Sequence, residues 1–276
     1  MTTAADVAKL IATRYSDDSL ASLPAAASET IALQLRHRSV RKFTDQPISE
    51  AELTSILAAG LSASVSSNLQ LFSVVTIRDR ERMQRISAAI GGHPYVESAE
   101  VFLIWLVDLH RAVAMAEAAE SQVESLPYLE NTLVGFVDCG IAAQNTLLAA
   151  ESLGMGGVFV GSVRNNPVAV AEELNLPPHV FPAFGMSLGW PDPNEQAGTK
   201  PRVPMEAVVH HETYDAEAWR EPVVEYESRL AGYYANYGKP DYSWQRTILG
   251  RIGAIKGLHG REQMREWLTQ LGLESR

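Results

Sequence analysis

The sequence has 276 residues, 46% of them hydrophobic and 20% charged, which is the composition of a globular protein with one large core and excludes disorder and collagen-like repeats. Lys and Arg total 23 against 33 Asp and Glu, so the formal net charge of -10 argues against nucleic acid and anionic membranes as partners. The single cysteine, Cys139, excludes an intramolecular disulfide and a thiolate metal cluster, and it is typical of a protein of the reducing cytoplasm.

The first 30 residues contain a short apolar pattern at helical spacing, followed by a connection rich in Ala and Ser. Asp6 and Lys9 interrupt the apolar residues at this end, so no signal peptide is expected. No segment of the chain approaches the ~18 consecutive apolar residues that a membrane-spanning helix needs. We therefore expect residues 1–30 to be an appendage to a core that covers residues 31–200.

Residues 31–200 show alternating helix and strand patterns. Ser49 and Glu52 form a capping box ahead of a helix that ends near residue 62. Residues 101–107 are all apolar, which is typical of a strand covered on both faces. Further strands are expected over 71–77, 158–160 and 181–188, and further helices over 80–90 and 167–174.

A long helix is predicted over residues 131–153, which contain no proline and are apolar nearly all round. At ~1.5 Å per residue it would be ~34 Å long. Such a helix must be buried, either within its own subunit or against a second one. A proline-rich stretch follows the last strand, and two amphipathic helices are expected near 216–234 and 261–271. The fold class is α/β, and residues 201–276 form a helical C-terminal extension of the same domain.

Two segments imitate catalytic motifs. The sequence GMSLG at residues 185–189 matches the nucleophile elbow of a serine hydrolase. That elbow needs a helix after the turn, whereas Pro191 and Pro193 follow here, so Ser187 is expected inside a strand and the hydrolase is kept only as an alternative. Cys139 lies among apolar neighbours in a predicted helix and is expected to be an inert thiol. The seven histidines show no ligand spacing, so no metal site is predicted.

Two basic segments are candidate anion sites. Residues 36–42, RHRSVRK, carry four fixed positive charges in an acidic protein, which indicates either an anion site or the solvated end of a helix. Lys200 and Arg202 form a second pair in a loop held by proline, where both side chains could reach one phosphate or simply be solvated. Between the two segments, residues 62–70 are rich in hydroxyls and amides, which can bind the polar edge of a heterocycle or cap a loop.

Six segments in this order resemble the nitroreductase family, in particular its oxygen-insensitive NADPH nitroreductase and NADPH:FMN oxidoreductase group. They are HRSVRKFTDQPIS at 37, SVSSNLQ at 64, DCGIAAQNTLLAAESLG at 138, GGVFVGSVRNN at 156, FGMSLGWP at 184 and KPRVP at 200. The resemblance runs from residue 37 to about residue 271. It implies a nitroreductase-like mixed sheet flanked by helices, and a homodimer with FMN bound at the subunit interface. A second subunit would then cover the long apolar helix.

The resemblance also implies a set of FMN contacts. They are His37, Arg38, Ser39, Arg41, Ser64, Ser66, Asn68, Gln70, His93, Gly161, Ser162, Arg164, Lys200 and Arg202. Ser39, Lys200 and Arg202 would bind the phosphate, and the loop at 64–70 would come from the other subunit. His93 stands where members of this group carry a glutamine that contacts the flavin ring. Arg41 would lie at the pyrimidine edge, where a cation stabilises the negative charge of reduced flavin.

The function that the resemblance implies is an FMN-dependent oxidoreductase with ping-pong kinetics. It would pass hydride from NADPH through flavin N5 to nitroaromatics, quinones, free flavin or similar small acceptors, and no side chain need act as acid, base or nucleophile. Arg261, with Lys239 as the second candidate, would bind the 2'-phosphate of NADPH. The alternatives are a flavin-binding storage or sensor protein without turnover, and the serine hydrolase.

Overall fold

The computed structural model describes residues 1–276 and divides them into two compact units. The sheet unit consists of residues 39–195 and 259–276. The helical unit consists of residues 1–38 and 196–258. The first residues thus share a unit with much of the C-terminal extension. The domain boundaries expected near residues 30 and 200 were placed from the sequence alone, and they stay a prediction.

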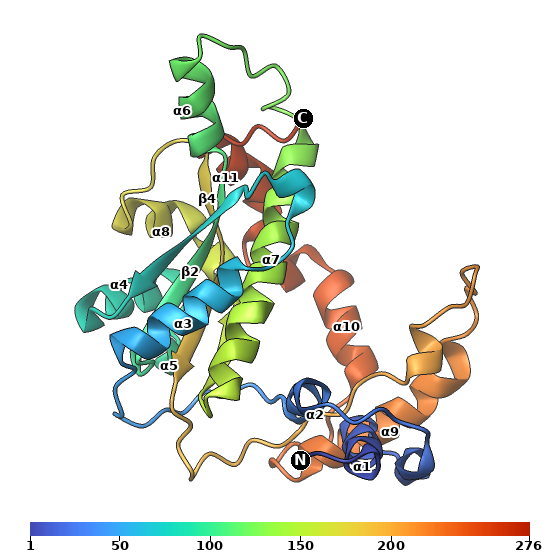
Figure 1. Cartoon of the computed structure of the whole chain (residues 1–276). Helices are drawn as coiled ribbons and strands as arrows, with labels where there is room; N and C mark the ends of the chain where they lie inside the picture. The colour runs from blue at the N-terminus through green and yellow to red at the C-terminus, as the bar shows by residue number, and fades with distance from the viewer. The chain divides into compact units, whose positions relative to one another are not determined.

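A four-stranded antiparallel sheet is the centre of the sheet unit (Figure 1). Its strands are β1 (Phe72–Ile77), β2 (Val101–Asp108), β3 (Gly156–Val160) and β4 (Val180–Gly189), in the order β1-β2-β4-β3. Val74 pairs with Trp105, Leu103 with Met186, and Val158 with Ser187. The resemblance implies a mixed sheet. Within this chain, all three strand pairs are antiparallel.

Strand β2 is buried on both faces, as its unbroken apolar sequence predicts. Because side chains alternate along a strand, Leu103 and Trp105 pack on the side of α3 (Glu50–Leu61) and α7 (Leu129–Ser152). Phe102 and Ile104 pack on the other side, in the cluster that includes residues of α4 (Arg80–Ile90) and α8 (Pro167–Glu173). Figure 1 shows these helices on opposite sides of the sheet. The sheet unit is therefore built of three layers.

Helix α7 is the main support of the sheet. Its buried residues include Asp138, Cys139 and Leu147, which are fully covered. Helix α3 packs closely against α7 at Gly60. A Cβ atom added there would lie 1.9 Å from the Thr146 Oγ1, so a larger residue would not fit without a change. By length and composition α7 is the one helix that could cross a membrane, and 44% of its most apolar window is buried inside the protein.

The remaining elements of the sheet unit are short. They are η2 (Ser66–Asn68), α5 (Pro94–Glu97), α6 (His110–Ala118), η3 (Gly161–Asn165), η6 (Arg261–Gln263) and α11 (Met264–Gln270). The chain end is tied to the start of α7, since the Leu129 N–H donates to the Arg276 carbonyl at 3.1 Å.

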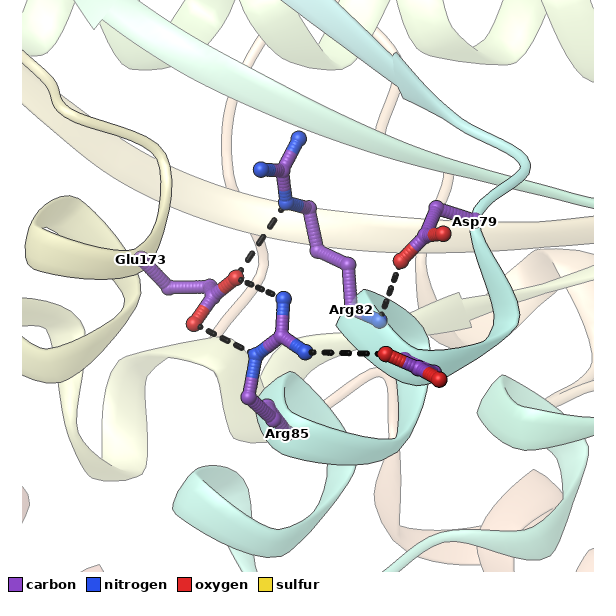
Figure 2. A network of polar contacts seen from close by, with 5 residues as sticks. Asp79, Arg82, Arg85 and Glu173 are labelled. Atoms are coloured by element: carbon purple, nitrogen blue, oxygen red, sulfur yellow. Dashed lines mark hydrogen bonds and ion pairs between the residues drawn. The ribbon is translucent and has the colours of Figure 1, made fainter.

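Helix α4 is tied to α8 by a network of ion pairs on the surface (Figure 2). The Glu173 carboxylate accepts from the Arg82 Nε at 3.2 Å and from the Arg85 Nε at 3.0 Å and Nη2 at 2.8 Å. The Asp79 side chain caps α4 by accepting from the Arg82 N–H at 2.7 Å. Hydrogen bonding to Arg85 lowers the pKa of Glu173.

The helical unit gathers elements from both ends of the chain. They are α1 (Ala4–Tyr15), η1 (Asp18–Ser22), α2 (Glu29–Arg36), η4 (Met205–Ala207), α9 (Arg220–Ala235), α10 (Trp244–Ile252) and η5 (Ile255–Leu258). Thr3 and Asp6 form a capping box at the start of α1. Arg229 of α9 joins the two parts of the chain, since its Nη2 lies 2.8 Å from the Asp17 carboxylate.

The expected fold class is confirmed, and most of the predicted elements form within a few residues of their expected bounds. The capping box at Ser49 and Glu52 is present. Four helices were not predicted: α2, α5, α6 and α10. Helix α2 ends at Arg36, so the basic segment 36–42 does begin at a helix end.

Candidate functional site

The loop of residues 64–70 is fixed at both ends by polar side chains of the sheet unit. At its start, the Ser66 N–H donates to the Oδ1 of fully buried Asp138 at 3.1 Å. At its end, the guanidinium of Arg111 donates to the carbonyl oxygen of Gln70. Two side chains of the sheet unit, Asp138 and Arg111, therefore hold the backbone of this loop in place.

Within the loop the backbone takes up an unusual conformation. Ser67, Asn68 and Gln70 have φ angles of 48°, 55° and 53°, in the left-handed region that side chains other than glycine rarely adopt. The Gln70 Nε2 donates to the Asn68 Oδ1 at 3.2 Å. The predicted contacts here, Ser64, Ser66, Asn68 and Gln70, are all exposed and free to meet a ligand. Strain of this kind, held by a rigid support, is concentrated at functional sites.

A second group of predicted contacts gathers where α4 ends. Gly91 and Gly92 have φ angles of 116° and 74°, which end the helix and turn the chain toward His93. The Asn165 Nδ2 of η3 donates to the Ile90 carbonyl at 3.0 Å. The structure thus brings the predicted segments 91–93 and 161–164 together.

Two buried polar atoms in this region have no partner within the chain. They are the His93 Nε2 and the Ser162 Oγ. The other ring nitrogen of His93 is hydrogen-bonded to the Tyr95 hydroxyl at 3.2 Å, and its backbone N–H donates to the Ser87 Oγ at 2.8 Å. Buried polar atoms are nearly always hydrogen-bonded, so these two fit the polar edge of a bound ligand. This is the donor and acceptor chemistry that a flavin ring requires.

Arg164 and Arg261 both have roles within the sheet unit. Arg164 donates through Nη1 to the carbonyl oxygen of Ala183 in β4. The Arg261 Nε donates to the Asn165 Oδ1 at 2.8 Å, next to the turn at His93. Arg261, the first candidate for the 2'-phosphate of NADPH, therefore belongs to the same region as the predicted flavin contacts.

The segment that follows Arg38 lies against the end of the sheet. The Val40 N–H donates to the Gly157 carbonyl at 3.0 Å, and Gly156 leaves room for Val40, since a Cβ atom there would lie 2.4 Å from the Val40 Cγ2. The Arg41 N–H donates to the Glu195 Oε1 at 2.8 Å. The backbone at Arg41 is thus held, and its side chain is exposed.

The helical unit brings the start of the first basic segment, residues 36–38, to the second, residues 200–202. The guanidinium of Arg14, in the last turn of α1, donates to the carbonyl oxygens of His37 and Lys200. The Arg202 N–H donates to the Arg14 carbonyl at 3.1 Å. The backbones that carry His37, Arg38, Lys200 and Arg202 are therefore joined within this unit.

An aromatic cluster of α9 lies beside this pair of segments. The Nζ of Lys200 lies 5.2 Å from the centre of the Tyr234 ring, and the Nζ of Lys239 lies 5.9 Å from it. The Tyr233 hydroxyl donates to the Gly198 carbonyl at 3.1 Å, just before Lys200. Lys239, the second candidate for the NADPH phosphate, thus lies near a predicted FMN ligand.

The two catalytic motifs of the sequence are ruled out by burial. Ser187 is fully buried and lies inside strand β4, which pairs with β2 and β3. No helix follows it directly, so it is not a hydrolase nucleophile. Cys139 is fully buried, and burial raises the pKa of its thiol far above the ordinary value of 9.0. Both predictions, a strand serine and an inert thiol, are confirmed.

Several supporting residues carried no signal in the sequence. Arg14, Arg111 and Asn165 contact backbone far away along the chain, and such contacts leave no local pattern. Asp138 did carry a signal, because a carboxylate inside an apolar helix needs a polar partner.

Comparison with known proteins identifies the family of this chain. Residues 35–190 match the nitroreductase family, and residues 200–276 match the nitroreductase family C-terminal domain. The chain belongs to the nitroreductase family.

Named relatives cover most of the chain. It is 37% identical over 251 residues to the NADPH-flavin oxidoreductase of Vibrio harveyi, covering 90% of this chain and 100% of that protein. It is 41% identical over 211 residues to the oxygen-insensitive NADPH nitroreductase of Salmonella typhimurium, covering 76% of this chain and 85% of that protein. The solved structure of the Vibrio harveyi NADPH:FMN oxidoreductase complexed with NAD+ superposes with a TM-score of 0.80 at 37% identity, covering 90% of this chain and 100% of that one.

Proposed function

We propose that this protein is an FMN-dependent oxidoreductase that takes hydride from NADPH and passes it to small electron acceptors such as nitroaromatics, quinones or free flavin. The observation that carries the proposal is that two buried polar atoms, the His93 Nε2 and the Ser162 Oγ, have no hydrogen-bond partner in a chain of the nitroreductase family. Both residues are among the flavin contacts expected from the sequence. When bound, FMN supplies the hydride-transfer chemistry at its N5 atom.

The residues of the protein would bind and orient the cofactor. Lys200 and Arg202 would neutralise the phosphate together with Ser39, and Arg41 would place its charge at the pyrimidine edge. His93, Ser162 and the backbone of Gly161 and Arg164 would satisfy the polar edge of the ring. The remaining contacts proposed are His37, Arg38, Ser64, Ser66, Asn68 and Gln70. Arg261, and next Lys239, would bind the 2'-phosphate of NADPH.

We also propose that the protein is a homodimer. Leu129, Leu133, Val137 and Ile141 lie four residues apart along α7 and are 40%, 50%, 57% and 42% exposed. Four apolar side chains at this spacing form one stripe, which costs free energy when left in water. A hollow of about 470 Å³ lies between this stripe and the start of the loop at 64–70. A second subunit on this face would cover the stripe next to a predicted flavin-binding loop.

The absorption spectrum of the purified protein tests the proposal directly. Bands near ~370 and ~450 nm would identify the flavin, and stopped-flow mixing with NADPH should bleach the ~450 nm band before an acceptor restores it. A bound flavin that NADPH does not bleach would point instead to a storage or sensor protein. Absence of flavin binding to the purified chain would contradict the proposal.

Sedimentation velocity tests the dimer. Val137→Glu places a charge in the stripe and should yield monomers that no longer retain FMN. Met115→Glu is the matched control, because Met115 is 67% exposed on α6 and lies outside the stripe. A wild-type monomer loaded with flavin would contradict the dimer. The cytoplasmic location stays a prediction.

A further inference from the structure

Arg14 connects the two basic segments of the helical unit through their backbones. Its Nη1 donates to the Lys200 carbonyl at 3.1 Å, and its Nη2 donates to the Leu35 carbonyl at 2.6 Å and to the His37 carbonyl. The Arg14 carbonyl in turn accepts from the Arg202 N–H at 3.1 Å. One residue therefore bridges chain segments that lie more than 160 positions apart in the sequence.

The surroundings of Arg14 make this link rigid. The residue is only 6% exposed, so its hydrogen bonds are shielded from competing water. A planar guanidinium holds several acceptors at fixed angles, which an ammonium group cannot do. The Arg202 Nη1 donates to the same Lys200 carbonyl at 3.2 Å. The backbones that carry Arg38, Lys200 and Arg202 are thus fixed in relation to one another.

We propose that Arg14 is a positioning residue for the binding of the FMN phosphate. It does not itself touch the phosphate. It sets the spacing of the segments that carry the phosphate ligands, and it adds a buried positive charge behind them. This inference rests on the proposed function, in which Lys200 and Arg202 bind the phosphate. Arg14 lies outside the residues that match the nitroreductase family, which begin at residue 35.

Two flavins separate a positioning role from a general structural one. FMN and riboflavin differ only in the phosphate, so a defect at the phosphate site weakens FMN and spares riboflavin. Dissociation constants for both would be measured by fluorescence quenching with the full-length chain. Arg14→Met should raise the FMN Kd by ~10-fold or more, the range of a lost charge-assisted hydrogen bond, and change the riboflavin Kd less than ~2-fold. Arg14→Lys keeps the charge but not the planar fork and should lie between.

The matched control is Arg229→Met. Arg229 is also a partly buried arginine of the helical unit, and it links α9 to Asp17 through an ion pair of 2.8 Å. Its hydrogen bonds go to Asp17 and Glu225 and not to the basic segments, so the ratio of the FMN Kd to the riboflavin Kd should stay at the wild-type value. If Arg14→Met does not fold, Arg14→Lys carries the test, and its ratio should still rise by ~3-fold.

Coupling to Lys200 gives a second readout. The Arg14 Nη1 donates to the backbone carbonyl of Lys200, so Lys200→Ala removes the proposed phosphate ligand and keeps this acceptor in place. In that background Arg14→Met should raise the FMN Kd by less than it does in the wild type. Full additivity would overturn the positioning role.

The remaining outcomes are also decisive. Equal weakening of FMN and riboflavin by Arg14→Met would show a structural role only and overturn the inference. If Lys200→Ala and Arg202→Ala weaken FMN binding while neither Arg14 variant does, the inference fails and the proposed phosphate site stands. If Lys200→Ala and Arg202→Ala leave the FMN Kd unchanged, the proposed phosphate site itself fails.

Discussion

The backbone N–H of Ser66 donates a hydrogen bond of 3.1 Å to the Oδ1 of Asp138, a fully buried carboxylate on the central helix α7. The Oδ2 of the same carboxylate is buried without a partner in the chain. The loop of residues 64–70 is therefore tied to the helix that supports the whole sheet.

Asp138→Ala should loosen that loop. The substitution leaves the Ser66 N–H without its acceptor, and a hydrogen bond to a charged group contributes ~1.5 to 3 kcal/mol. We expect faster hydrogen exchange over residues 64–70 and an FMN Kd raised by ~10-fold or more. Asp138→Asn retains an oxygen acceptor and should have a smaller effect. Glu117→Gln, an exposed carboxylate of α6, is the control, and exchange as slow as in the wild type for Asp138→Ala would disprove the role of this contact.

Arg41→Ala should lower the reduction potential of bound flavin. A cation at the pyrimidine edge interacts more strongly with the reduced, negatively charged ring than with the neutral oxidised one. A difference of ~2 kcal/mol would appear as roughly 40 mV for a two-electron couple. The backbone N–H of Arg41 keeps its bond to Glu195 in this variant, so the segment should stay in place.

Spectroelectrochemical titration with saturating FMN measures this effect. Arg202→Ala, which acts on a phosphate whose charge is the same in both redox states, should weaken FMN binding and leave the midpoint potential nearly fixed. Lys42→Ala removes a neighbouring charge and serves as the control. Equal midpoints for Arg41→Ala and the wild type would place Arg41 away from the ring.

Gly60→Ala should destabilise the sheet unit. The added Cβ would lie 1.9 Å from the Thr146 Oγ1 and 3.3 Å from the Ala142 carbonyl oxygen, so either Thr146 turns away and loses its bond to the Ala142 carbonyl, or α3 moves away from α7. Overpacking of this kind costs ~1 to 3 kcal/mol in the free energy of unfolding. The double variant with Thr146→Ala should recover part of the loss. Gly232→Ala in α9 has open space around it and should not lower the denaturant midpoint.

Glu173→Gln should reduce stability in a manner that depends on pH. Hydrogen bonds from Arg85 hold the pKa of Glu173 below its ordinary value of 4.5, so the unfolded chain binds a proton at higher pH than the folded one. The contribution of Glu173 is therefore complete well above pH ~4.5 and is lost as the pH falls through the lower folded pKa.

The difference in Tm between the wild type and Glu173→Gln should thus be constant well above pH ~4.5 and should decrease as the pH falls below it. The ion pairs are exposed, so the difference should be small and should shrink in ~1 M salt. Glu172→Gln changes the net charge equally at an exposed position of the same helix and is the control. A difference that grows as the pH falls would contradict the assignment.

Most of the sheet unit could be predicted from the sequence because its signals are local. The capping box at Ser49 fixed the start of α3, and the apolar run at 101–107 marked the central strand β2. Helix α7 was predicted from 131 to 153, and the structure places it at Leu129–Ser152. Its exposed stripe could not be separated from its buried face, because apolar residues surround the helix.

The supports of the candidate site were less accessible. The carbonyl contacts of Arg14 join residues that are far apart in sequence, and an arginine near the N-terminus reads as an ordinary surface residue. Helix α10 was missed although Trp244, Ile248 and Ile252 lie at helical spacing, because a segment of nine residues gives only a short pattern. The left-handed residues of the loop, such as Asn68, could not be foreseen, since nothing in a run of Ser and Asn specifies a positive φ.

The helical unit is assembled from residues 1–38 and 196–258, and this order has a consequence for how the chain folds. During synthesis α1 leaves the ribosome before any of its C-terminal partners exists. The Arg14 guanidinium can bond the carbonyls of Leu35 and His37 early, but its bond to the Lys200 carbonyl must wait until that residue has been made. The strands of the sheet, in contrast, are all complete by residue 189, so the sheet can form first. Closing the helical unit requires a long chain loop, which is slow, so a nascent or unfolded chain exposes α1 for longest.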